Sequence, residues 1–339
     1  MAEFSYQSNL AAYMMQLMEE KHAHGHESRH LPFELRQIDR YLAEHPTGIE
    51  ITESYYQQWF ANLDDSNLSR KTIYRKASAF CQLLGYMRNI GIKCHVPRLP
   101  RENDYRFIPY IYSQDEVQSL FLAADSLRIR NETNRTCLMP IPALIRLLYS
   151  TGMRVGEAIG LKNRDVDFAR HRILLESPKN RHQRLCPVNP SLENVLRDYI
   201  GYRNRLPIEH LTDEDSPFFV TRTGQALDRG GVERWFRNIL KKAGIPYRGH
   251  FAGPRVHDLR HTACVHAMIK LANEGMDLQC SLPVLSKFLG HLNPYSTERY
   301  LRLTQEMFPD VIHRANMELS DIEAVIDKAC KTEHWDEDE

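Results

Sequence analysis

Residues 141–157 have the sequence IPALIRLLYSTGMRVGE. The first part of this stretch is apolar at the spacing of a buried helix, and Pro142 suits a first helical turn. Gly152 follows the apolar run and is typical of a helix end. We therefore expect a helix that ends near Gly152, followed by a turn in which the Arg154 guanidinium can face a ligand instead of the core.

Short strands are expected beyond this helix. Arg172–Glu176 and residues 184–188 resemble two strands joined by a polar turn at 177–183, and residues 218–220 are a third strand candidate. The rest of this half alternates helices and loops. The predicted fold class is therefore mainly α with a small β-sheet.

The first hundred residues show apolar helical periodicity throughout. The longest predicted helix there covers residues 69–89. Four basic residues near its start are candidate phosphate contacts, although they also fit an ordinary solvated face: Arg70, Lys71, Arg75 and Lys76. After this helix, residues 96–106 combine prolines with charges, which indicates an extended linker.

The predicted organisation has four parts. These are a helical domain at 1–100, a linker at 101–109, a second domain at 110–305 and a C-terminal helix with an acidic tail at 306–339. A capping box from Ser113 to Glu116 predicts the helix that opens the second domain. No segment of fixed period repeats along the chain.

Length and composition exclude several protein classes. The chain has 339 residues, of which 42% are apolar and 26% charged, as in soluble globular proteins. No apolar run approaches the about 20 residues of a membrane span, and the N-terminus lacks the pattern of a secretory signal. Seven cysteines without a CxxC pair favour a reduced, cytoplasmic protein.

The charge is unevenly distributed along the chain. The formal net charge is zero, with 44 basic and 44 acidic residues. Residues 303–339 alone have 11 acidic and 3 basic residues, and residues 68–106 have 9 basic and 2 acidic residues. A basic body with an acidic tail is compatible with a polyanionic partner.

Four separated stretches carry side chains suited to phosphoryl chemistry. Arginine forks bind phosphate oxygens bidentately, tyrosine is a possible covalent nucleophile, and lysine or histidine can protonate a leaving oxygen. No cluster of acidic residues suggests a pair of Mg²⁺ ions, so neither a metal nor another cofactor is expected. The candidate residues are Arg154, Lys179, His257, Arg260, His291 and Tyr300.

The order and the sequences of these motifs resemble those of the tyrosine recombinase (integrase) family. The relevant motifs are TGMRVGE at 151–157, HDLRH at 257–261, and LGH at 289–291 with a tyrosine nine residues later. The resemblance covers about 110–305 and, more weakly, the helical first domain. It implies a core-binding domain and a catalytic domain that form a C-shaped clamp around double-stranded DNA.

The resemblance also implies residue roles and a reaction. Arg154 and Arg260 would be the arginine pair, Lys179 the hairpin lysine, and His257 and His291 the two histidines. Tyr300 would attack a phosphodiester and form a 3′-phosphotyrosine with a free 5′-hydroxyl, without metal or ATP. A homotetramer on DNA would exchange strands, and an accessory protein could set direction.

Some assignments have alternatives within the sequence. Tyr295 competes with Tyr300, and Arg181 and Arg184 compete with Lys179; Arg184 also matches a recurring basic position of the family and is a candidate DNA contact. His257 and His261 could instead be helix caps or core residues. Four N-terminal histidines could bind a metal but fit a polar loop better: His22, His24, His26 and His30.

Several functions fit these motifs. The sequence of residues 273–283 favours an integrase or transposase of a mobile element, with chromosome- or plasmid-dimer resolution as the alternative. A type IB topoisomerase-like enzyme or a non-catalytic DNA-binding regulator are further alternatives. The C-terminal segment could solubilise the chain or dock on a neighbouring subunit.

Overall fold

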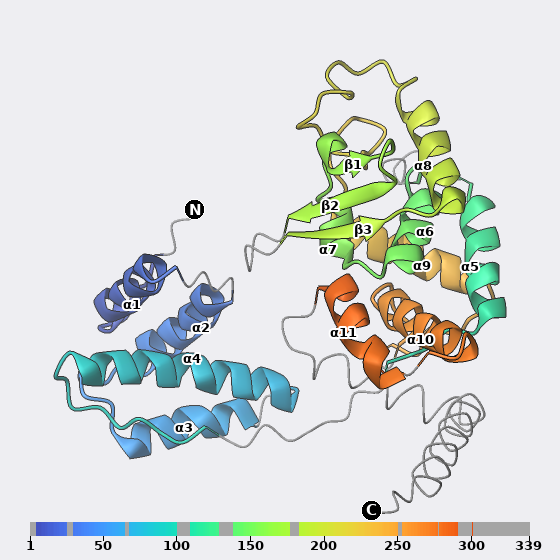
Figure 1. Cartoon of the computed structure of the whole chain (residues 1–339). Coiled ribbons are helices and arrows are strands. Elements are labelled where there is room, and N and C mark those ends of the chain that lie inside the picture. Colours follow the sequence, from blue (N-terminus) through green and yellow to red (C-terminus); the bar gives the residue numbers. More distant parts are fainter. Residues whose placement is uncertain are drawn as a thin grey trace, which may run out of the picture. The chain divides into compact units, whose positions relative to one another are not determined.

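The computed structural model describes residues 5–25, 30–64, 68–99, 109–128, 138–176, 183–249, 253–276, 278–290 and 300. The chain divides into two compact units, Met1–Phe107 and Ile108–Glu339 (Figure 1). Each unit has its own apolar core. The C-terminal segment 306–339 and most of the predicted linker lie outside the described residues.

The first unit is built from helices around a central one. Its helices are α1 (Ala11–Ala23), α2 (Leu31–Glu44), α3 (Glu53–Asp64) and α4 (Arg70–Asn89). The other three helices all pack against α4, which buries Phe80 and Leu84 completely. The Ser69 side chain caps α4 by accepting a hydrogen bond from the Thr72 backbone N–H at 3.2 Å. The helix predicted at 69–89 is therefore confirmed.

The second unit combines helices with one small sheet. Its elements are α5 (Gln114–Asp125), α6 (Ile141–Thr151), α7 (Val155–Ile159), the 3-10 helix η2 (Asn163–Asp165), β1 (Val166–Asp167), β2 (Arg172–Glu176), β3 (Gln183–Pro187), α8 (Pro190–Arg203), α9 (Arg229–Lys242), α10 (Asp258–Asn273) and α11 (Leu278–Leu289). The strands are antiparallel in the order β1-β2-β3, with Ile173 opposite Cys186.

Helix α6 organises this unit. It packs against α5, α7, α8 and α10, and it buries Leu144, Ile145 and Leu148. Helix α10 packs against both α6 and α11, and α11 also contacts β3 (Figure 1). The ends of α6, α10 and α11 and the strand β3 thus belong to one packed assembly.

The predicted fold class, mainly α with a small β-sheet, is confirmed. The capping box is also present, since Ser113 and Glu116 bond reciprocally at the start of α5. The strand predicted at 218–220 is wrong. Phe218 and Phe219 are both buried side by side in an aromatic cluster, whereas neighbouring residues of a regular strand point to opposite faces.

In the described part of the chain, no helix has the length and apolar character needed to cross a bilayer.

Candidate active site

The turn after α6 positions Arg154. Gly152 ends the helix in the left-handed conformation, with φ of 59°, and its N–H donates to the Leu148 carbonyl oxygen at 3.0 Å. Arg154 then precedes α7, and both its backbone N–H and its Nη1 donate to the Glu157 carboxylate, at 2.8 and 2.7 Å. The Arg154 side chain is 47% exposed, so it can still reach a ligand.

Arg260 is the buried arginine of the site. It lies in the first turn of α10 and is 3% exposed. Its Nη1 donates to the Gly152 carbonyl oxygen at 2.6 Å and its Nη2 to the Leu289 carbonyl oxygen at 2.8 Å. Burial, followed by the charge of Arg154, lowers the pKa of Arg260 to about 10, so the guanidinium stays charged at neutral pH.

His257 is the residue directly before α10. Burial and then the charges of nearby arginines, Arg260 first, lower the pKa of His257 to about 4. The imidazole is therefore neutral near pH 7 and can accept a hydrogen bond. The following residue, Asp258, is fully buried and accepts the Arg255 backbone N–H at 2.7 Å, which secures the turn that holds His257.

Tyr300 lies against α10. Its hydroxyl is 2.8 Å from Nδ1 of His261, the residue after Arg260, and the two rings are 5.5 Å apart. The His261 ring in turn meets the His257 ring edge-to-face at 4.9 Å. Tyr300 is 4% exposed and belongs to an apolar cluster with Leu289. The phenol thus lies next to two imidazoles, within a mostly apolar environment.

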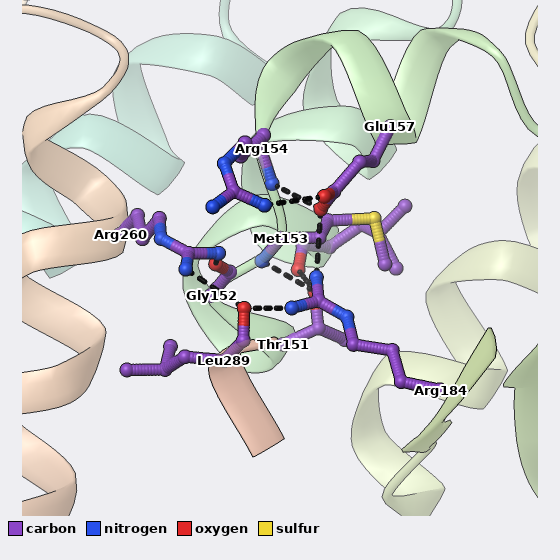
Figure 2. A network of polar contacts seen from close by, with 9 residues as sticks. Thr151, Gly152, Met153, Arg154, Glu157, Arg184, Arg260 and Leu289 are labelled. Atoms are coloured by element: carbon purple, nitrogen blue, oxygen red, sulfur yellow. Dashed lines mark hydrogen bonds and ion pairs between the residues drawn. The ribbon is translucent and has the colours of Figure 1, made fainter. Parts of the chain in front are cut away.

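A second polar network joins β3 to these residues, as Figure 2 shows. Arg184 donates from Nη2 to Glu157 at 2.7 Å and from Nη1 to the Leu289 carbonyl oxygen. Glu157 therefore binds Arg154 and Arg184 together. Burial alone would raise the pKa of Glu157, but the backbone hydrogen bond from Arg154 and the charges of both arginines lower it below its usual range.

Four of the six predicted catalytic residues are brought together by the second unit. These are Arg154, His257, Arg260 and Tyr300. Lys179 and His291 lie outside the described residues. His261 belongs to the HDLRH motif but was not among the six catalytic candidates, and its ring contacts the Tyr300 hydroxyl.

The basic residues of α4 differ from one another in their surroundings. Arg70 and Lys71 are exposed at the start of the helix. Arg75 pairs through Nε with Glu34 at 2.6 Å, and Lys76 bonds to Gln37 with its side chain 12% exposed. Their predicted role as phosphate contacts stays a prediction, as does that of Arg184.

The sequence allows the N-terminal histidines to be metal ligands, although it fits a polar loop better. His26 lies outside the described residues. Among those that are described, no three His, Cys, Asp or Glu side chains cluster as a metal site would require.

The arrangement is suited to work on a phosphodiester. Two cationic guanidiniums, one exposed and one buried, lie beside a neutral imidazole and a phenol. Guanidiniums bind phosphate oxygens and stabilise charge that develops on phosphorus. A phenol hydrogen-bonded to an imidazole is a nucleophile beside a proton acceptor.

Known proteins resemble this chain in sequence and fold. Residues 112–307 match the sequence model of the phage integrase family. The chain is 31% identical over 208 residues to the Sinorhizobium fredii protein y4rB, named as an integrase/recombinase, and the match spans 61% of this chain and 65% of that relative. It is 25% identical over 283 residues to tyrosine recombinase XerC of Chlamydia pneumoniae, spanning 81% of each protein.

A solved structure shares the fold. The XerH site-specific recombinase, bound to a palindromic difH substrate in a post-cleavage complex, superposes with a TM-score of 0.63 at 17% identity. The match covers 83% of this chain and 78% of that one.

Proposed function

The chain belongs to the phage integrase family and is a tyrosine recombinase, an enzyme that cuts and rejoins DNA strands; we propose that Tyr300 is the nucleophile of this reaction. The observation that carries the assignment is the 2.8 Å contact between the Tyr300 hydroxyl and His261, in the same turn of α10 as Arg260. The phenol therefore already lies beside the arginine that would bind the phosphate.

In the proposed cleavage step, Tyr300 Oη forms a bond to phosphorus while the bond from phosphorus to O5′ breaks. The phenolic proton passes to an imidazole, and the 2.8 Å contact of His261 Nδ1 with the hydroxyl supports His261 in this role. The departing O5′ takes a proton from Lys179 or His291. The products are a 3′-phosphotyrosine and a free 5′-hydroxyl. A 5′-hydroxyl of the partner duplex then reverses these bond changes, so the step needs no ATP.

The arginines stabilise this step by holding the phosphate. Arg154 is half exposed and makes the first contact with DNA. Among the described residues, Arg260 bonds to two backbone carbonyls and so uses two of its five N–H donors, which leaves donors for a phosphate oxygen. Because Tyr300 is 4% exposed, DNA binding must rearrange its surroundings before the hydroxyl can attack.

A nicked suicide substrate tests the nucleophile. Such a duplex releases the short 5′-hydroxyl strand after cleavage and so traps the covalent adduct. We expect an adduct with the wild-type protein and none with Tyr300→Phe, while Tyr295→Phe, the matched control, retains it. An adduct that persists in Tyr300→Phe and disappears in Tyr295→Phe would assign the nucleophile to Tyr295.

The biological reaction is proposed to be integration or excision of a mobile element. The wording of residues 273–283 and the similarity to an integrase/recombinase favour this role. The similarity to XerC over 81% of the chain equally favours resolution of chromosome or plasmid dimers.

The DNA that flanks the gene discriminates between these two roles, since element ends or inverted repeats are expected only for a mobile element. Recombinant products, as opposed to simple relaxation of supercoiled DNA, separate both roles from that of a topoisomerase.

We further propose that the protein acts in the cytoplasm as a homotetramer clamped on its DNA site, with an accessory protein setting direction. Residues 306–339, which are acidic and contain apolar helical stripes, would dock on the next subunit. Truncation at Phe308 is expected to weaken assembly on DNA more than cleavage of a single site. Full assembly of the truncated chain, measured by gel shift, would contradict the docking.

A further inference from the structure

Arg184 has the surroundings of an internal support. It lies on β3, opposite Leu175 of β2, and its side chain is 11% exposed. One end of its guanidinium donates to the Glu157 carboxylate at 2.7 Å and the other to the Leu289 carbonyl oxygen (Figure 2). A side chain held in this way is poorly placed to reach a DNA backbone.

The Leu289 carbonyl is the point that this support holds. Leu289 is the last residue of α11, so its carbonyl oxygen has no partner within the helix. Two guanidiniums supply the missing donors, Arg184 from β3 and Arg260 from α10. Positive charge at a helix C-terminus is also favourable because the backbone dipoles leave that end partly negative.

Gly290 makes the contact with Arg184 possible. Its φ is 66°, and a Cβ atom at this position would lie 2.9 Å from Arg184 Cδ and 3.1 Å from Cζ. Side chains rarely adopt such a φ, and the Arg184 guanidinium would have to move. The glycine of the LGH motif therefore lets β3 approach the end of α11 closely.

The same guanidinium also reaches the other side of the site. Glu157 is shared by Arg184 and Arg154, and Arg260 joins Leu289 to Gly152, the residue that ends α6. A continuous set of bonds thus runs from the Arg154 turn to the end of α11. Residues 291–300, which carry His291 and Tyr300, begin directly after this fixed point.

We propose that Arg184 is a positioning residue: it fixes the end of α11 against the Arg154 turn and so sets where the chain that carries Tyr300 begins, without contacting DNA. This inference rests on the proposed function of Tyr300. It assigns to β3 a role in the geometry of the nucleophile, in addition to the hairpin that it forms with β2.

The test separates DNA binding from chemistry. For Arg184→Ala we expect an unchanged dissociation constant and an unchanged salt dependence of DNA binding. At saturating DNA, the rate of adduct formation on the suicide substrate should fall about 10- to 100-fold, since a displacement of about 1 Å at a reacting centre costs that much. Arg170→Ala, which removes an exposed charge from the turn between β1 and β2, is the control and should keep the wild-type rate.

Two further variants keep the test decisive if Arg184→Ala folds poorly. Gly290→Ala leaves every charge in place but obstructs the guanidinium, and it should reproduce the rate defect. Arg184→Lys keeps the positive charge but loses the planar fork that spans the two acceptors, and it should recover part of the rate. Guanidinium ions added to Arg184→Ala should also restore part of the rate, which a globally unfolded variant would not allow.

Two results would contradict the positioning role of Arg184. A salt slope reduced by about 0.9, with weaker DNA binding and a normal rate at saturation, would make Arg184 a phosphate contact and overturn the proposal. A wild-type rate in Gly290→Ala would overturn it as well. Failure of the proposed function is recognised separately, because the wild-type protein would then form no adduct that depends on Tyr300.

Discussion

The protonation state of His257 links the site to folding stability. The unfolded chain protonates this imidazole below its ordinary pKa of about 6.5, whereas the folded chain does so only near pH 4. Between these values the unfolded state binds more protons, so the free energy of unfolding should decrease as pH falls from about 6.5 to 4, by at most about 1.4 kcal/mol per pH unit. His257→Gln should flatten this dependence in denaturant titrations at several pH values. Equal slopes for both proteins would show that the imidazole is protonated in the folded state.

At the scale of elements, Gly152 joins the end of α6 to α11. Its φ is 59°, and a Cβ atom there would lie 2.8 Å from Leu289 Cδ2. Gly152→Ala should therefore destabilise the protein by about 1–3 kcal/mol, from the left-handed backbone and the displaced leucine. Gly156→Ala, in α7, is the matched control, because a Cβ there meets nothing within 4 Å. This substitution should raise the free energy of unfolding by about 0.5–1 kcal/mol. Thermal unfolding measures both, and equal effects would contradict the close contact.

At the scale of the whole molecule, the uneven charge predicts how salt acts on DNA binding. Arg70 and Lys71 are exposed, and their predicted role is phosphate contact; on that prediction, replacing both with alanine should reduce the slope of log K against log salt by up to about 1.8. Lys76 bonds to Gln37 and lies 4.0 Å from Glu34, inside the first unit. Lys76→Ala should therefore lower stability while it leaves the salt slope unchanged. A slope lowered by Lys76→Ala alone would show that Lys76 turns outward to DNA.

The features predicted correctly share a local origin. The end of α6 at Gly152, the helix predicted at 69–89 and the capping box at Ser113 each depend on residues that are close together in the chain. Arg154, His257 and Arg260 were singled out by their side-chain chemistry and by the family resemblance, and their catalytic roles stay predictions. Position along the chain was sufficient for these inferences.

The features that were missed depend on residues far apart in the chain. Residues 218–220 have the composition of a strand, but the two phenylalanines fill the core together and no regular ladder forms there. The destination of the Arg184 guanidinium, a carbonyl 105 residues away, has no signal in its own neighbourhood. The same is true of His261, whose partner Tyr300 is 39 residues away.

The amino-acid sequence thus determined the helical fold class, the family and the set of reactive side chains, since caps, periodicity and motif chemistry are properties of short segments. Tertiary packing determined which of those side chains are buried, which are exposed and which bond to other parts of the protein. It buries Arg260 on two backbone carbonyls, leaves Arg154 half exposed and turns Arg184 inward. These outcomes depend on where α6, α10, α11 and β3 meet. A buried charged side chain needs hydrogen-bond partners, and only folding brings those partners close to it.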